Sequence, residues 1–191
     1  MMKYQKIIIG LLVLITTVSF SQKNTYVIET EIGDIVFKTY PKKSPIAVKN
    51  FEKYEQKGDF EGASFYRVVR MDNQPNDSIR IEVIQGNFTA SENSEGPIPH
   101  VTNDKTGIKH KDGAVSMARG KPGTASVAFF ICINDQPDLD FGGKRNPDGQ
   151  GFDAFGMVVS GMDIVRKIQS GETEQQTLKS PINITRIYKK N

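Results

Sequence analysis

Short apolar runs, separated by glycine-containing or polar turns, recur along this chain and limit its fold more than any other feature. Residues 26–40 alternate on both sides of Gly33, which is typical of a β-hairpin. Further strands are predicted at 64–70, 79–85, 114–118, 126–133, 154–159 and 182–188. Only two helices are predicted, at 44–58 and 161–170; the first opens on a Ser-Pro pair and stops at a glycine. This pattern favours a mainly β fold, a closed eight-stranded antiparallel barrel capped by two α-helices.

The beginning of the chain has the organisation of a secretory signal. Two lysines precede an uncharged stretch of 14 residues, from Ile7 to Phe20, and small residues suit a cleavage site after Ser21. The stretch is short for a membrane span of about 20 residues, so cleavage is favoured over an uncleaved anchor. We therefore predict a signal peptide at 1–21, one domain at 22–191, and an exported protein that is periplasmic or extracellular.

Charge and cysteine content exclude several classes of protein. The formal net charge of +3 falls to +1 without the two lysines of the leader, which gives no electrostatic basis for nucleic-acid binding. The single cysteine, Cys132, allows no internal disulfide and is expected to be a buried hydrophobic residue. The acidic, glycine-rich residues 138–149 do not match a calcium-binding loop. Neither His100 nor His110 has an evident orienting acid, so nucleophilic catalysis is not predicted.

Two predicted strands are apolar on both faces, although a small barrel needs only one apolar face for its interior. Residues 126–133 (SVAFFICI) carry Val-x-Phe-x-Ile on one face and Ala-x-Phe-x-Cys on the other. Strict alternation in 64–70 (SFYRVVR) puts Phe65, Arg67 and Val69 on one face, with a guanidinium between two apolar side chains. The outer apolar face must be covered by a loop, a helix or a ligand.

Several motifs resemble those of the cyclophilin-type peptidyl-prolyl isomerases. The main one is MARGKPGTASVAFFI at 117–131, and FYRVV (65–69), VIQGNF (83–88) and FDAFGMVVSGMDIVRKI (152–168) resemble other segments of the family. They occur in the family's order, and the resemblance runs from about Tyr26 to Tyr188. It implies a cyclophilin-like barrel that isomerises peptidyl-proline bonds without a cofactor or metal.

The resemblance also implies roles for individual residues. Arg67 matches the catalytic arginine, and Gln85 matches the glutamine that fixes this arginine and contacts substrate. The positions implied for substrate binding are Glu82, Val83, Ala118, Arg119, Phe130, Leu139 and Phe152.

The chain departs from the family's pattern at the pocket. Glu82 aligns with a pocket phenylalanine, after extra residues within 70–81. Either the strand is shifted and Ile81 fills that place, or the pocket has lost an aromatic wall. Ala128 replaces a usual glutamine, and Asp138 is the nearest match to a tryptophan found in many members. Such departures resemble bacterial members and are expected to weaken cyclosporin binding more than catalysis.

Two functions remain open from the sequence. The first is an isomerase that assists the folding of exported proteins by stabilising a twisted X-Pro amide, with Arg67 as the donor. The second is a catalytically weak module that binds proline-containing or unfolded segments. The expected partners are proline-containing segments of exported proteins, without nucleic acid or membrane insertion after cleavage, and the chain is expected to be a monomer.

Overall fold

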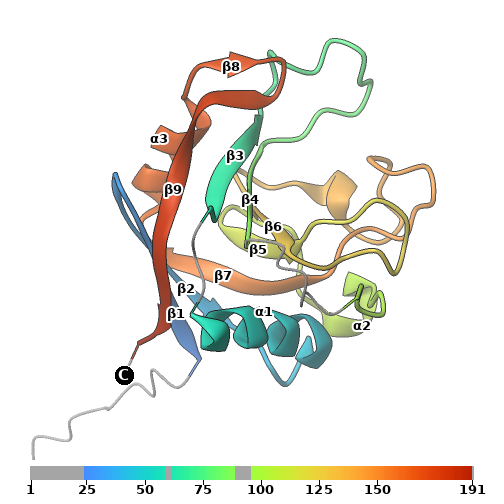
Figure 1. The fold of residues 1–191 in the computed structure, drawn as a ribbon. Coiled ribbons are helices and arrows are strands. Elements are labelled where there is room, and N and C mark those ends of the chain that lie inside the picture. The colour runs from blue at the N-terminus through green and yellow to red at the C-terminus, as the bar shows by residue number, and fades with distance from the viewer. Residues whose placement is uncertain (1–23, 59–61, 89–95, 191) are drawn as a thin grey trace, which may run out of the picture.

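The computed structural model describes residues 24–58, 62–88 and 96–190 (Figure 1). The predicted signal peptide at 1–21 lies outside these residues. Within the described part of the chain, no helix is both long enough and apolar enough to cross a membrane.

One antiparallel sheet closes on itself to form the barrel (Figure 1). The described strands are β1 (Thr25–Thr30), β2 (Gly33–Thr39), β3 (Ser64–Val69), β4 (Val83–Asn87), β5 (Ala114–Met117), β6 (Ala128–Cys132), β7 (Ala154–Ser160), β8 (Thr173–Glu174) and β9 (Thr177–Lys189). Their order is β1-β2-β7-β5-β6-β4-β3-β9, and pairing of β1 with β9 closes the ring. The two-residue β8 pairs only with β9. The predicted closed eight-stranded antiparallel barrel is confirmed.

Both predicted helices are present, as α1 (Pro45–Lys57) and α3 (Met162–Gln169). Gly58 ends α1 in the left-handed conformation, at φ 64°. The described residues add a short helix, α2 (Asn103–Thr106), and a 3₁₀ turn at Pro137–Leu139. Figure 1 shows α1 below the barrel and α3 at its upper left, so the two main helices cover different parts of it.

A group of aromatic side chains packs together in the barrel interior, among aliphatic ones. Phe51 of α1 meets Phe37, Phe129 and Phe155 with ring centroids 5.2–6.3 Å apart. A second buried cluster lies outside the barrel wall and contains Val69, Ile81, Val83, Ala114, Phe130, Cys132, Leu139 and Phe152. Strand β6 contributes to both clusters, as its two apolar faces predict, and Cys132 is fully buried.

A β-bulge in β3 corrects the predicted alternation of SFYRVVR. The register of β3 shifts between Phe65 and Arg67 against both β4 and β9. Phe65 and Val68 therefore both belong to the interior cluster, while Val69 belongs to the outer one. The prediction that Phe65 shares a face with Arg67 was wrong, because strict alternation does not allow for an extra residue in the strand.

Other boundaries also differ from the predicted ones. The β1–β2 turn lies at residues 31–32, and Gly33 already pairs with Thr30. The predicted strand at 79–85 begins only at Val83. Before this strand, the Gln74 side chain forms hydrogen bonds with both backbone groups of Ile81. Its Oε1 accepts from the Ile81 N–H (3.2 Å), and its Nε2 donates to the Ile81 carbonyl (2.8 Å). A side-chain amide thus takes the place of a neighbouring strand.

Candidate active site

A cavity of about 440 Å³ opens on the outer wall of the barrel. The predicted site residues that line it are Arg67, Val83, Gln85, Ala118, Arg119, Phe130, Leu139 and Phe152. Residues from strands β3, β4 and β6 and from the loops at 118–127 and 139–152 therefore converge on one place. Glu82 is the one predicted site residue that the structure does not bring to this cavity.

The Arg67 guanidinium is held from two sides. Its Nη1 donates to Oε1 of Gln85 at 2.7 Å, while Nε and Nη2 donate to Oε1 of Gln176 at 3.1 and 2.5 Å. Gln85 faces Arg67 because these residues pair across β3 and β4. The Gln85 Nε2 donates to the Tyr66 hydroxyl at 2.6 Å, which orients this amide. Burial lowers the pKa of Arg67, but the pKa of an arginine lies so far above neutral pH that the side chain stays charged.

Apolar side chains form the other walls. Phe130 and Phe152 meet edge to face, with ring centroids 5.3 Å apart, and Leu139 is fully buried beside them. Ile81 also lines the cavity, whereas the Glu82 Oε2 accepts from Asn134 Nδ2 (2.8 Å) in an exposed contact. The lining of the cavity therefore favours Ile81 over Glu82 as the residue in the place of the expected aromatic one, although Ile81 precedes β4 and provides an aliphatic wall.

The Arg119 guanidinium is turned into the loop beside the cavity. It donates to both carboxylate oxygens of Asp148 (2.8 and 2.9 Å) and to the Gly151 carbonyl, and it lies 4.9 Å from the ring centre of Phe152. The side chain is only 1% exposed. Hydrogen bonds from Arg119 lower the pKa of Asp148 to about 2. Arg119 therefore supports the Phe152 wall, and Ala118 next to it lines the open cavity.

A Ser-His-Asp arrangement lies behind the Phe130 wall. His110 Nδ1 is 2.8 Å from Asp140 Oδ1, and His110 Nε2 is 3.0 Å from Ser116 Oγ. An orienting acid is thus present, contrary to the sequence-based expectation. Burial alone would raise the pKa of Asp140, but hydrogen bonds from His110 lower it. The His110 side chain is fully buried and stacks on Phe130, so the arrangement supports the wall and cannot reach a substrate.

Sequence reasoning missed three polar residues near Arg67. Tyr66 reaches the outer face only because of the bulge, and Gln176 comes from the turn between β8 and β9, far away in sequence. Arg145 lines the cavity and joins two loops, since it donates to the Ile79 carbonyl at 2.6 Å and pairs with Asp77 at 3.0 Å. Tyr66 lies within the FYRVV segment, but strict alternation put it on the face opposite Arg67. Gln176 and Arg145 belong to none of the quoted motifs, so no sequence signal indicated them.

Comparison with known proteins agrees with this site. The family model described as "Cyclophilin type peptidyl-prolyl cis-trans isomerase/CLD" matches residues 25–189. The chain belongs to this family. Its enzyme class is therefore peptidyl-prolyl cis-trans isomerase. The described residues contain no group of three or more His, Cys, Asp or Glu placed to hold a metal ion.

Relatives and structural neighbours carry the same family name. The chain is 33% identical over 146 residues to peptidyl-prolyl cis-trans isomerase B of Escherichia coli K12, covering 75% of this chain and 83% of that protein. It is 30% identical over 176 residues to a peptidyl-prolyl cis-trans isomerase of Acinetobacter baylyi, covering 88% and 87%. A cyclophilin-type isomerase of Cryptosporidium parvum, solved in the presence of the dipeptide Ala-Pro, matches with a TM-score of 0.67 at 20% identity, over 87% of this chain and 99% of that one.

Proposed function

We propose that this cyclophilin-type isomerase acts on X-Pro bonds of exported proteins, with Arg67 as the donor to the twisting amide. The observation that carries the proposal is the Arg67 guanidinium, which Gln85 and Gln176 fix beside the apolar walls of the cavity. The Cryptosporidium parvum neighbour was solved in the presence of Ala-Pro, which supports a proline-containing ligand for this chain as well.

The reaction asks for a fixed donor and a fixed proline ring. Rotation about a peptide bond has a barrier of about 18–20 kcal/mol, and no covalent bond breaks. Twisting leaves a pyramidal nitrogen with a lone pair and moves the carbonyl oxygen, so a donor that meets either atom stabilises the transition state. The walls at Phe130, Leu139 and Phe152 hold the ring while the preceding residue turns.

Some N–H groups of Arg67 remain available for a substrate. A guanidinium has five N–H groups. Gln85 takes one of them and Gln176 takes two, so one N–H on Nη1 and one on Nη2 have no partner among the described residues. These two groups belong to a partly buried guanidinium at the cavity, where a hydrogen bond to the substrate is stronger than in water.

Mutation of Arg67 tests the catalytic part of the proposal. In a coupled proline-isomerisation assay, Arg67→Ala should lower kcat/KM at least about tenfold, because an N–H donor to the transition state is worth a few kcal/mol. The matched control is Arg80→Ala, because Arg80 is exposed and donates only to the Met71 carbonyl among the described residues. A fall of less than about threefold, near 0.6 kcal/mol, would show that Arg67 is not the donor.

Export and the monomeric state belong to the same proposal. The organisation of residues 1–21 supports export to the periplasm or the exterior. Cell fractionation with an antibody against the chain tests it: retention of the uncleaved chain in the cytoplasm would contradict export. Light scattering measures the molar mass in solution, and a mass of two or more chains would contradict the monomeric state.

The second candidate is a binding module with little catalysis. It is favoured by Ala128, which lines the cavity where the family usually has a glutamine and so removes one polar contact. Peptide binding by the wild-type chain without measurable isomerisation would support this module. Catalysis that Arg67→Ala abolishes supports the enzyme.

A further inference from the structure

We infer that Gln176 is a second positioning residue for Arg67, and that the loop at 70–77 holds Gln176 in place. The inference rests on the proposed function in one respect, namely that Arg67 is the donor. Gln176 lies in the turn between β8 and β9, at the edge of the sheet.

The first step is the geometry of the guanidinium. Gln85 contacts it through one hydrogen bond, at Nη1, and a single bond leaves the guanidinium plane free to turn about that contact. Gln176 Oε1 accepts from Nε and Nη2, which are adjacent donors on the opposite edge of the group. Contacts on both edges fix the plane and the direction in which the remaining N–H groups point.

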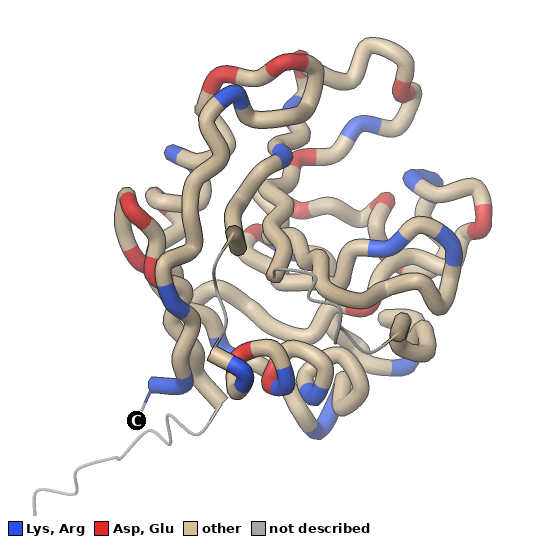
Figure 2. The backbone as a smooth tube through the Cα atoms, in the orientation of Figure 1, with Lys and Arg blue, Asp and Glu red and all other residues tan. Residues whose placement is uncertain are grey.

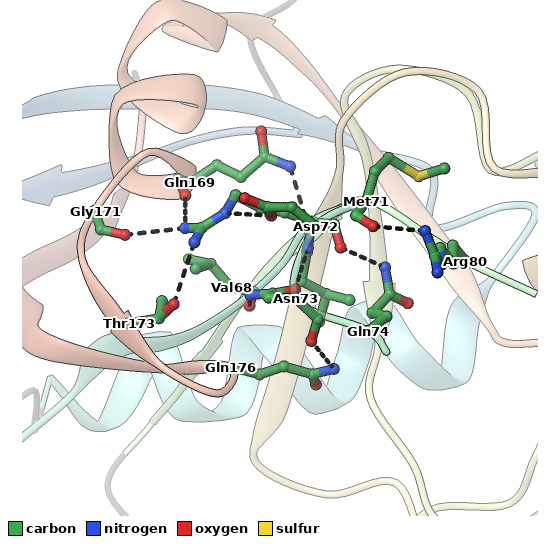
Figure 3. Close-up of polar contacts among 12 residues, drawn as sticks. Val68, Met71, Asp72, Asn73, Gln74, Arg80, Gln169, Gly171, Thr173 and Gln176 are labelled. Atoms are coloured by element: carbon green, nitrogen blue, oxygen red, sulfur yellow. Dashed lines mark hydrogen bonds and ion pairs between the residues drawn. The ribbon is translucent and has the colours of Figure 1, made fainter. Parts of the chain in front are cut away.

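The second step is the orientation of the Gln176 amide. Its Nε2 donates to the carbonyl of Asn73 at 3.4 Å, so the amide has an acceptor on its far side (Figure 3). Turning the amide over would point its NH₂ group at the guanidinium, donor against donor, and its oxygen at a carbonyl. The loop carbonyl therefore selects the orientation that presents Oε1 to Arg67.

The third step is the anchoring of the loop. Asn73 donates from Nδ2 to the Val68 carbonyl (3.0 Å) and accepts at Oδ1 from the Arg70 N–H (2.8 Å). The Arg70 guanidinium donates to the carbonyls of Gln169 and Gly171, both at 2.9 Å, and to Thr173 Oγ1 at 3.2 Å. Figure 3 shows these contacts joining the loop to the end of α3 and to the β8–β9 hairpin.

The backbone of Gln176 is fixed as well. Its carbonyl accepts from the Val68 N–H at 2.9 Å, and Thr177, the next residue, pairs with Arg67 across β9 and β3. Gln175, just before it, has a left-handed φ of 55°, which closes the turn. The extra residues after β3 therefore have a specific use: they supply the carbonyl that orients the amide facing Arg67.

Two variants at Gln176 and one matched control test the inference. Gln176→Leu keeps the size and removes the acceptor, so kcat/KM should fall about tenfold while the peptide dissociation constant changes less than about twofold. Gln176→Glu keeps an acceptor toward Arg67 but places a carboxylate oxygen against the Asn73 carbonyl, so it should restore only part of the rate. Gln56→Leu makes the same substitution at an exposed residue of α1 whose side chain forms no hydrogen bond among the described residues, and should leave kcat/KM unchanged.

A double-mutant cycle and a spectroscopic readout separate positioning from folding. In the Arg67→Ala background, Gln176→Leu should cause no further loss, because the effect passes through Arg67. By NMR, the Arg67 Nε–H should exchange slowly with water in the wild-type chain and much faster in Gln176→Leu. Unchanged exchange, or an equal loss of rate in both backgrounds, would overturn the inference. A rate that does not depend on Arg67 would overturn the proposed function, and the exchange measurement would still decide whether Gln176 holds Arg67.

Discussion

Asp153 should make the stability of the fold depend on pH, and replacement by asparagine should remove that dependence. Asp153 is 3% exposed and immediately precedes β7. Its Oδ1 accepts from the Ser44 hydroxyl at 2.9 Å, and its Oδ2 has no hydrogen-bond partner among the described residues. Burial raises the pKa of Asp153 from 3.8 to about 6, while the hydrogen bond from Ser44 acts in the opposite direction.

The sign follows from the order of the two pKa values. Below pH 3.8 the carboxyl is protonated in both the folded and the unfolded chain and costs nothing. Between about pH 4 and 6 only the folded chain keeps the proton, so the free energy of unfolding falls as pH rises. Above about pH 6 the carboxyl is ionised in both states, and the full free-energy cost of burying the charged carboxylate lowers the stability of the fold. A shift of about two pKa units corresponds to about 3 kcal/mol, at 1.36 kcal/mol per unit.

Denaturant unfolding at several pH values measures this contribution. The free energy of unfolding of wild type relative to Asp153→Asn should fall by about 2–3 kcal/mol between pH 4 and pH 7.5. Ser44→Ala removes the hydroxyl that favours the ionised form, so the midpoint of the change should move to higher pH. Parallel stability curves for wild type and Asp153→Asn over this range would refute the reasoning.

Two further predictions concern the walls of the cavity. Arg119→Ala should weaken peptide binding several-fold in a titration, because the support behind Phe152 is lost and Asp148 loses its ion-pair partner. Unchanged binding would show that Phe152 keeps its place without Arg119. Gln74→Leu should lower the free energy of unfolding by about 1–3 kcal/mol, because the Ile81 backbone groups lose their partners, and it should also lower kcat/KM. Equal stability and rate in Gln74→Leu and wild type would contradict the role given to Gln74.

Periodic and contiguous features were predicted well from the sequence. The α1 helix follows a 3.6-residue apolar stripe between a Ser-Pro start and Gly58, and it forms as predicted. The two apolar faces of β6 depend only on alternation within a short regular strand, and Phe129 and Phe130 indeed belong to different clusters. The positions of Arg67, Gln85 and Phe130 came from motifs, and these residues converge on one cavity.

Features that depend on distant partners were not predicted. The stretch from Ile79 to Glu82 has the composition of a strand, but Gln74 occupies the backbone groups of Ile81 that a neighbouring strand would need. Gln176 lies 109 positions from Arg67, in a short polar turn that gives no periodic signal. Such contacts are fixed by tertiary packing, which local pattern reasoning does not contain.

The bulge in β3 explains how a guanidinium stands between apolar residues without disrupting the core. The extra residue leaves Phe65 and Val68 in the barrel interior and turns Tyr66 toward Gln85, beside Arg67. Tyr66 then accepts from the far side of the Gln85 amide, as the Asn73 carbonyl does from the far side of the Gln176 amide. Both amides that hold the guanidinium are thus oriented by a partner behind them. Since an electrostatic catalyst works best when its donors need no rearrangement in the transition state, this double support is what the proposed isomerisation requires.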